Sequence, residues 1–217
     1  MLTKKTIALF GATGKTGQIF LKKALQEGFR VQALVRSPAK LDSKLLKNKS
    51  LTIIEGDVLK KADVFKTIKK SHVVVSLIGH NPQSPENLQT TGVKYMTQAM
   101  KDCKVTRIFS LTGAALAHKD DRPTFLQNVL NSAVRIIGNV RYTDSLNHAK
   151  VLERSNLNWT IIRANILTDV PKQKYVVDNL SSKTSLFVSR HAITQFIIDN
   201  IKSKKYYKKM PCIGDSI

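Results

Sequence analysis

The feature that most constrains this chain is an apolar run that enters a glycine-rich turn at residues 6–17, Thr-Ile-Ala-Leu-Phe-Gly-Ala-Thr-Gly-Lys-Thr-Gly. The run predicts a buried strand, and the turn opens a helix. Gly11 permits the sharp turn out of the strand, Gly14 lets a backbone approach a pyrophosphate, and Gly17 lets the helix lie close to the sheet. Free N–H groups and the positive end of the helix dipole then face the phosphates. The pattern predicts a dinucleotide-binding site.

The residues after this turn support the same interpretation. An amphipathic run follows, then a stop at Gly28 and a second apolar run at 31–35, and together these segments have the length of one βαβ unit. The Gly-Lys-Thr triplet at 14–16 also resembles the end of an ATPase phosphate-binding loop. That motif needs a glycine where Leu9 stands, so we expect Lys15 to be a solvated residue of the first helical turn.

Short apolar runs alternate with helical patterns along the chain. Short runs rich in β-branched residues are typical of strands that are buried on both faces of a parallel sheet. The alternation predicts an α/β fold with a doubly wound, mostly parallel sheet of the Rossmann type. It forms a single NAD(P)-binding domain over 1–217, with small substrate-cleft elements at about 113–140 and 164–190. A last helix is expected to start at the capping residue Ser189 and to run to Ile201. The expected strands are 6–10, 31–35, 51–55, 73–78, 107–112 and 159–163, and the other expected helices are 15–27, 60–70, 87–103 and 141–155.

The chain is strongly basic. Its 36 Lys and Arg against 15 Asp and Glu give a net charge of +21 over 217 residues, a balance that is common in proteins that bind nucleic acid or anionic membranes. Here the basic residues are spread along the chain as singles and pairs, which favours a compositional bias with solvated helix faces. We therefore do not expect nucleic acid as a partner. Steering of anionic ligands such as NADPH, or weak polyanion binding, remains the alternative.

Two cysteines, Cys103 and Cys212, show neither metal-ligand nor redox spacing, so we expect reduced thiols and no metal site. The apolar run near the N-terminus is too short for a signal peptide, and no later run approaches the length of a membrane span. These observations predict a cytoplasmic protein without a membrane partner. We expect it to be a monomer or a homodimer that acts on a small molecule.

In a doubly wound sheet, ligands bind at the carboxyl ends of the strands, so the residues directly after the apolar runs are candidate site residues. Arg36 ends the second run, where an enzyme selective for NAD presents an acidic residue to the ribose hydroxyls. Its guanidinium can pair with the 2′-phosphate of NADP, and Lys40 can supply a second charge. After the third run, Asp57 is interpreted either as a neighbour of the adenine or as the cap of the helix 60–70.

Two further strand ends carry candidate groups for chemistry. Gly79 would let the backbone pass near the nicotinamide ribose, and His80 is interpreted either as a surface residue or as a proton donor near neutral pH. Ser110 and Thr112 alternate on one face of the fifth strand, where a hydroxyl can touch the nicotinamide or a substrate carbonyl. Thr112 stands at the very edge of the strand and is therefore the better candidate.

These segments together resemble a known family. The segments 10–17, 34–41 (Leu-Val-Arg-Ser-Pro-Ala-Lys-Leu), 55–58 (Glu-Gly-Asp-Val) and 150–163 (Lys-Val-Leu-Glu-Arg-Ser-Asn-Leu-Asn-Trp-Thr-Ile-Ile-Arg) are similar to those of atypical short-chain dehydrogenases/reductases. Within these, the chain resembles the NAD(P)H-binding, NmrA-like group that contains flavin reductase/biliverdin-IXβ reductase, over nearly its whole length. The resemblance implies a Rossmann fold with the adenine near Asp57 and Val58 and the nicotinamide near Gly79 and Thr112. It also implies that NADP is held by Gly11, Thr13, Gly14, Lys15, Thr16, Gly17, Arg36 and Lys40.

The chain departs from the larger family at the catalytic acid. That family carries a Tyr-x-x-x-Lys pair, in which the lysine activates the tyrosine as a proton donor. Here Leu146 stands four residues before Lys150, and Tyr142 stands eight before it. Because it lacks this pair, the chain resembles the flavin reductase branch, in which the protein mainly positions the hydride donor and acceptor. That branch usually has prolines and a histidine beside the substrate, where this chain has Ala-Asn-Ile at 164–166. Lys150 is interpreted either as a ligand of the nicotinamide ribose or as part of an exposed helix face.

Three hypotheses about function follow. The first is an NADPH-dependent oxidoreductase that transfers hydride to a planar acceptor such as a flavin, quinone or tetrapyrrole, with Thr112, Lys150 and His80 as candidate catalytic residues. The second is a non-catalytic NADP-binding redox sensor whose occupied and empty forms engage a partner differently. The third, an epimerase or isomerase of the extended family, ranks last, because 217 residues leave little room for a sugar-nucleotide substrate domain.

Overall fold

The computed structural model describes residues 5–118, 121–179 and 185–215. Its strands are β1 (Thr6–Phe10), β2 (Arg30–Val35), β3 (Leu51–Glu55), β4 (Val73–Ser76), β5 (Arg107–Gly113), β6 (Asn158–Ala164), β7 (Ile166–Thr168), β8 (Tyr175–Asp178), β9 (Phe187–Ser189) and β10 (Cys212–Asp215). Its α-helices are α1 (Lys15–Gln26), α2 (Ser43–Leu46), α3 (Lys61–Ile68), α4 (Leu88–Asp102), α5 (Phe125–Ile137), α6 (Asn139–Glu153) and α7 (Arg190–Asn200), and a 3-10 turn spans Pro38–Lys40.

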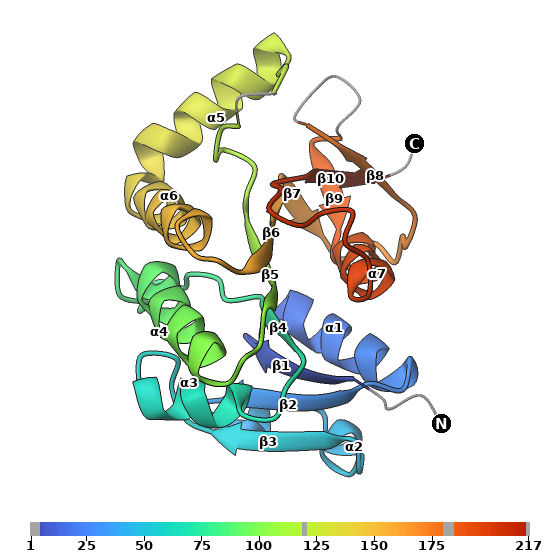
Figure 1. The fold of residues 1–217 in the computed structure, drawn as a ribbon. Coiled ribbons are helices and arrows are strands. Elements are labelled where there is room, and N and C mark those ends of the chain that lie inside the picture. The colour runs from blue at the N-terminus through green and yellow to red at the C-terminus, as the bar shows by residue number, and fades with distance from the viewer. Residues whose placement is uncertain (1–4, 119–120, 180–184, 216–217) are drawn as a thin grey trace.

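An eight-stranded sheet with helices on both faces forms the body of the molecule (Figure 1). The strands lie in the order β3-β2-β1-β4-β5-β6-β10-β8, and all neighbours run parallel except β8, which runs antiparallel to β10. A separate two-stranded sheet pairs β7 with β9. The arrangement confirms the predicted doubly wound, mostly parallel fold.

Two apolar cores, one on each face, hold the helices to the sheet. Alternate residues of a strand point to opposite faces, so Ile7 and Leu9 of β1 pack with the apolar sides of α1 and α7. Ala8 and Phe10 pack with those of α3, α4 and α6. Within the described ranges, none of the helices has the length and apolar character needed to cross a membrane.

The sequence located the six long strands and five of the helices to within two residues at each end. Ser189 caps α7 as expected, because its hydroxyl accepts the N–H of His191. The expected strand 73–78 ends early, at Ser76, so that Leu77 and Ile78 already belong to a loop. The sequence did not predict the strands β7–β10, because their apolar runs are shorter than the run 73–78 that marks β4.

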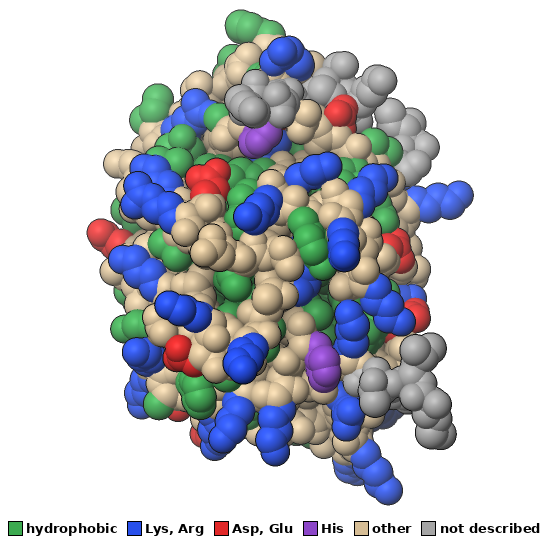
Figure 2. All heavy atoms as spheres, in the orientation of Figure 1, with side chains coloured by type: hydrophobic (Ala, Val, Ile, Leu, Met, Phe, Trp, Pro, Cys, Tyr) green, Lys and Arg blue, Asp and Glu red, His purple; other side chains and the backbone are tan. Residues whose placement is uncertain are grey.

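The expected substrate-cleft segment 113–140 contains a loop followed by α5. Residues 119–120 of this segment, and 180–184 of the second expected segment 164–190, lie outside the described residues. Apolar side chains of α5 remain in solvent, with Phe125 85% and Ile137 87% exposed. Figure 2 shows hydrophobic surface at the end of the molecule where α5 lies, and basic side chains with few acidic ones over the rest of this face. A role of both segments in holding substrate stays a prediction.

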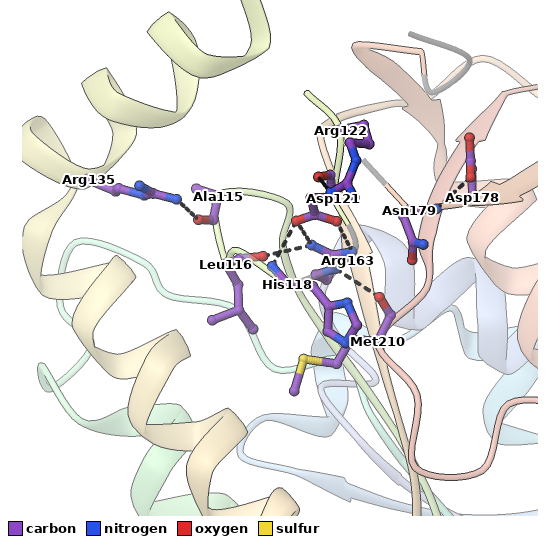
Figure 3. A network of polar contacts seen from close by, with 10 residues as sticks. All are labelled: Ala115, Leu116, His118, Asp121, Arg122, Arg135, Arg163, Asp178, Asn179 and Met210. Carbon is purple, nitrogen blue, oxygen red and sulfur yellow. Dashed lines mark hydrogen bonds and ion pairs between the residues drawn. The ribbon is translucent and has the colours of Figure 1, made fainter. Parts of the chain in front are cut away.

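A buried ion pair fixes the loop that leads from β5 to α5 (Figure 3). The guanidinium of Arg163, on β6, is fully buried and donates to both carboxylate oxygens of Asp121, at 2.6 Å and 2.7 Å. It also donates to the backbone carbonyls of Leu116 and Met210. Because a buried charge is stable only when it is paired and hydrogen-bonded, the pair ties this loop to the sheet.

Asp121→Ala should lower the free energy of unfolding by about 3–5 kcal/mol, because it leaves the charge of Arg163 buried without a carboxylate. Urea denaturation followed by circular dichroism measures this change. Glu27→Ala is the matched control, because it breaks the more exposed pair that Glu27 makes with Lys23 and should cost less than about 1 kcal/mol. Equal small losses in both variants would contradict an anchoring role for Asp121.

Candidate functional site

A cleft of about 680 Å³ lies at the carboxyl ends of the parallel strands, bordered by the turn after β1 and by the ends of β4, β5 and β6. This is the edge at which a doubly wound sheet binds ligands. Of the predicted site residues, Gly17 and Lys150 do not line the cleft. The predicted residues that line it are Gly11, Thr13, Gly14, Lys15, Thr16, Arg36, Lys40, Asp57, Val58, Gly79, His80 and Thr112.

The glycines give the turn after β1 its shape. Gly11 has a φ of +85°, in the left-handed region that favours glycine. A Cβ on Gly17 would lie 1.9 Å from the carbonyl oxygen of Gly11, so glycine is required for α1 to approach the turn. Gly17 therefore allows the close approach of α1 that the glycine pattern predicts, and its expected place among the residues that hold the cofactor stays a prediction. A Cβ on Gly14 would meet the same oxygen at 3.4 Å, so the space beside Gly14 is open to a ligand.

The N-terminus of α1 stands at the cleft. Gly14 is its N-cap residue, and no side chain caps the helix. The N–H groups of Lys15 and Thr16, both of which line the cleft, have no intrahelical acceptors. Backbone N–H groups of this kind, together with the helix dipole, form an anion site that suits a pyrophosphate.

Lys15 shares a carboxylate with a second cation of the cleft. Its Nζ lies 3.3 Å from Asp169, just after β7, and Nη1 of Arg190 lies 2.7 Å from the same carboxylate. The hydrogen bond from Lys15 is the main cause that lowers the pKa of the Asp169 carboxyl, and Arg190 acts in the same direction. Arg190 lines the cleft, and sequence reasoning missed it. Its one signal was its place directly after the predicted helix cap.

The end of β2 carries two unpaired cations. Arg36 and Lys40 are exposed, line the cleft and have no acidic partner in the described part of the chain. Asp57, at the end of β3, also lines the cleft and accepts a hydrogen bond from the N–H of Leu59 at 2.9 Å. The interpretation of Asp57 as a helix cap was wrong, because the N-cap of α3 is Lys60 and no side chain caps it.

The two hydroxyls at the end of β5 have different surroundings. Thr112 lines the cleft and is 5% exposed, and its Oγ1 has no hydrogen-bond partner among the described residues. A buried hydroxyl without a partner is costly, so a ligand that bonds to Thr112 would remove this cost. Ser110 instead contacts Nε2 of His148 at 2.7 Å. Burial lowers the pKa of His148 to about 4, so this imidazole is neutral near pH 7.

The side chain of His80 is hydrogen-bonded to a buried carboxylate. Its Nε2 lies 2.7 Å from Oδ2 of Asp144, on α6, and the two side chains are 7% and 1% exposed. The interpretation of His80 as a surface residue was therefore wrong. Asp144 also accepts the backbone N–H groups of Gln89 and Thr90, in the first turn of α4, at 2.7 Å and 2.9 Å. Sequence reasoning missed Asp144, because one acidic residue in a polar helix is indistinguishable from a solvated one.

Lys150 does not belong to this group. Asp144 and His148 are buried on the inner side of α6, and Lys150 is exposed two residues further on, where the helix has turned by about 200°. Of the two interpretations of Lys150, the structure favours the exposed helix face, because Lys150 does not line the cleft. Tyr142 does not line the cleft either, and its ring lies under the guanidinium of Arg135.

The model of a family described as NAD(P)H-binding matches residues 11–204. YwnB, an uncharacterized protein of Bacillus subtilis, is 30% identical over 118 residues, which are 54% of this chain and about half (52%) of that protein. A short-chain dehydrogenase/reductase from Veillonella parvula in complex with NADP has a TM-score of 0.82 at 19% identity, over 97% of this chain and 94% of that one. ChuY from Escherichia coli O157:H7, described as an anaerobillin reductase, has a TM-score of 0.78 at 17% identity, over 98% and 97% of the two chains. The two structural likenesses confirm the fold.

Gly14→Val should abolish NADPH binding and leave the fold intact, because a branched side chain would fill the open space in front of the helix N-terminus. The measurement is a fluorescence titration with NADPH, with circular dichroism as the check on folding. Gly14→Ala, which adds a single methyl group, should weaken binding less. Wild-type affinity in a folded Gly14→Val variant would mean that the phosphates bind elsewhere.

Proposed function

Because the chain belongs to the NAD(P)H-binding family, we propose that it is an NADPH-dependent reductase that passes hydride to a planar acceptor such as a flavin, a quinone or a linear tetrapyrrole. The observation that carries the proposal is the continuity of the cleft. One cavity extends from Arg36 and Lys40, past the glycine turn, to Gly79, Thr112 and Asn165. Direct hydride transfer needs donor and acceptor in contact, and a shared cavity provides this.

The choice of NADPH over NADH rests on the end of β2. Arg36 and Lys40 are cations without an acidic partner in the described ranges, and they lie where an acidic residue would select for NAD. Each can donate charge-assisted hydrogen bonds to the 2′-phosphate, and Arg36 can do so in a bidentate manner. The NADP complex of the structurally similar Veillonella parvula protein supports the same choice.

Arg36→Ala should remove most of the preference for NADPH over NADH. A hydrogen bond to a charged group contributes about 1.5–3 kcal/mol, so the Kd for NADPH should rise roughly tenfold to a hundredfold while that for NADH changes little. Fluorescence titration with both cofactors gives the four constants. Lys44→Ala, an exposed lysine outside the cleft, controls for the loss of one positive charge. Equal affinities of the wild-type protein for the two cofactors would rule out this assignment.

The acceptor side of the cleft suits a planar, largely apolar molecule. Leu111, Leu167 and Thr112 all line it, and the hydroxyl of Thr112 has no partner among the described residues. Small-molecule sites typically combine apolar walls with a few polar groups. Bound NADPH would supply the hydride. The glycine turn would hold the pyrophosphate of the cofactor. Thr112 would orient the carbonyl group of the acceptor or the amide of the nicotinamide, and the two leucines would exclude water. The structural similarity to ChuY supports the tetrapyrrole class of acceptor.

A redox sensor is the second candidate function. The observation that favours it is that the tyrosine acid of the larger family has no counterpart in the cleft, since Tyr142 and Lys150 both lie outside it. A sensor needs differential binding of a partner by the occupied and empty forms and no turnover. The cofactor side of the cleft serves either function.

Steady-state turnover separates the two functions. The purified protein with saturating NADPH is tested against FMN, menadione and biliverdin, and oxidation of NADPH is followed by absorbance. A reductase should oxidise NADPH well above background with at least one acceptor, and the Gly14→Val variant should not. If no acceptor of a broad panel is reduced, and a macromolecular partner instead binds with an affinity that depends reciprocally on NADP, the reductase proposal fails.

A further inference from the structure

The carboxylate of Asp144 is a buried negative charge whose ionisable hydrogen-bond partner is a histidine. Its side chain is 1% exposed, and its donors are two backbone N–H groups of α4 and Nε2 of His80. Among the described residues, no lysine or arginine forms an ion pair with it. Because buried charges are normally paired, a proton on His80 would give this carboxylate its counter-ion.

The same contacts fix which nitrogen of His80 is engaged. An ionised carboxylate only accepts, so Nε2 of His80 donates to Asp144, and Nδ1 is left as the ring nitrogen that can take up and release a proton. His80 also lines the cleft, directly after Gly79 in the loop between β4 and α4. The ring of His80 therefore lies at the wall of the cleft in which the proposed acceptor would meet the nicotinamide.

We propose that His80 is the acid that completes reduction of the acceptor, and that Asp144 is its positioning residue. The inference rests on the proposed reductase function. The hydride adds with its electron pair to a carbon conjugated with the carbonyl group of the acceptor, and the π electrons of the C=O bond move onto its oxygen. That oxygen takes a proton from Nδ1 of the imidazolium, so that C=O becomes C–OH. His80 is left neutral and is reprotonated by water. The pair thus replaces the tyrosine and lysine that the chain lacks.

Other ionisable groups near the cleft are less suited to this step. His148, one turn after Asp144, is neutral because burial lowers its pKa to about 4, and it contacts Ser110 away from the cleft. Lys15 and Arg190 share the carboxylate of Asp169. The remaining charged residues that line the cleft are Arg36, Lys40 and Asp57.

The first experiment does not depend on turnover. Long-range ¹H–¹⁵N NMR of the five histidines reports the tautomer of each ring, and the His80→Gln variant identifies the signal of His80. We expect the Nε2–H tautomer for His80 in the wild-type protein and a shift away from it in Asp144→Asn. An Nδ1–H tautomer in the wild-type protein would overturn the assignment of Asp144 as the partner.

The second experiment compares two acceptors with different proton requirements. Hydride addition to menadione leaves the negative charge on a basic oxygen that takes up a proton, whereas FMN takes up the hydride at a ring nitrogen and its less basic, delocalised anion can leave unprotonated. His80→Gln should lower kcat with menadione about a hundredfold, leave kcat with FMN within about threefold, and leave the Kd for NADPH unchanged. His191→Gln, a half-buried histidine outside the cleft, should behave as the wild-type protein.

The outcomes separate the two proposals. If His80→Gln affects both acceptors equally or neither, while the wild-type protein turns over, His80 only ties its loop to α6 and the acid is elsewhere. If the wild-type protein reduces no acceptor, the reductase function itself fails. Asp144→Asn should reproduce the menadione defect, and the double variant should fall no further, because both residues act in one step. Circular dichroism shows whether Asp144→Asn keeps its fold, and His80→Gln decides the question if it does not.

Discussion

The contact between α1 and the turn after β1 determines where a ligand can bind in this molecule. A Cβ on Gly17 would lie 1.9 Å from the carbonyl oxygen of Gly11, so glycine alone brings the helix N-terminus down to the end of β1. Its uncapped N–H groups then stand at the edge where β4 and β5 also end. The backbone contact places the N-terminus of α1 at the cleft, and the parallel topology brings the ends of the strands to the same edge of the sheet.

Two buried carboxylates organise the segments around this cleft. Asp121 follows β5 and pairs with Arg163 of β6, whereas Asp144 lies on α6 and joins His80 to the first turn of α4. Both join segments that are far apart in the sequence, at the desolvation cost that any buried charge carries. Their partners differ in one respect, since arginine keeps its charge at all relevant pH values and histidine can lose it. The first pair is therefore suited to anchoring, and the second to proton chemistry as well.

The positions of individual basic side chains at the cleft say more about ligand binding than the net charge of the chain. On the face that Figure 2 shows, basic side chains are spread widely and few acidic ones lie among them. Arg36 and Lys40, at one end of the cleft, have no acidic partner among the described residues, while Lys15 and Arg190 are held by Asp169 near the helix N-terminus. The side chains of Arg36 and Lys40 can therefore bind a phosphate that lies away from α1, such as the 2′-phosphate. Near the N-terminus of α1, backbone N–H groups already provide an anion site, and the two cations there share a carboxylate.

The sequence by itself determined the order and boundaries of six strands and five helices, because their apolar periods and glycine punctuation are local. It also placed Thr112 and the glycine turn at the cleft, since the residues after parallel strands share one edge of the sheet. The tertiary structure decided the rest. Lys150 and Asp144 lie on one helix, and only the rotation of α6 against the sheet separates an exposed lysine from a buried carboxylate. The contacts of His80 with Asp144 and of Arg163 with Asp121 join residues 64 and 42 positions apart, and no local pattern records such a meeting, because it depends on how distant segments pack.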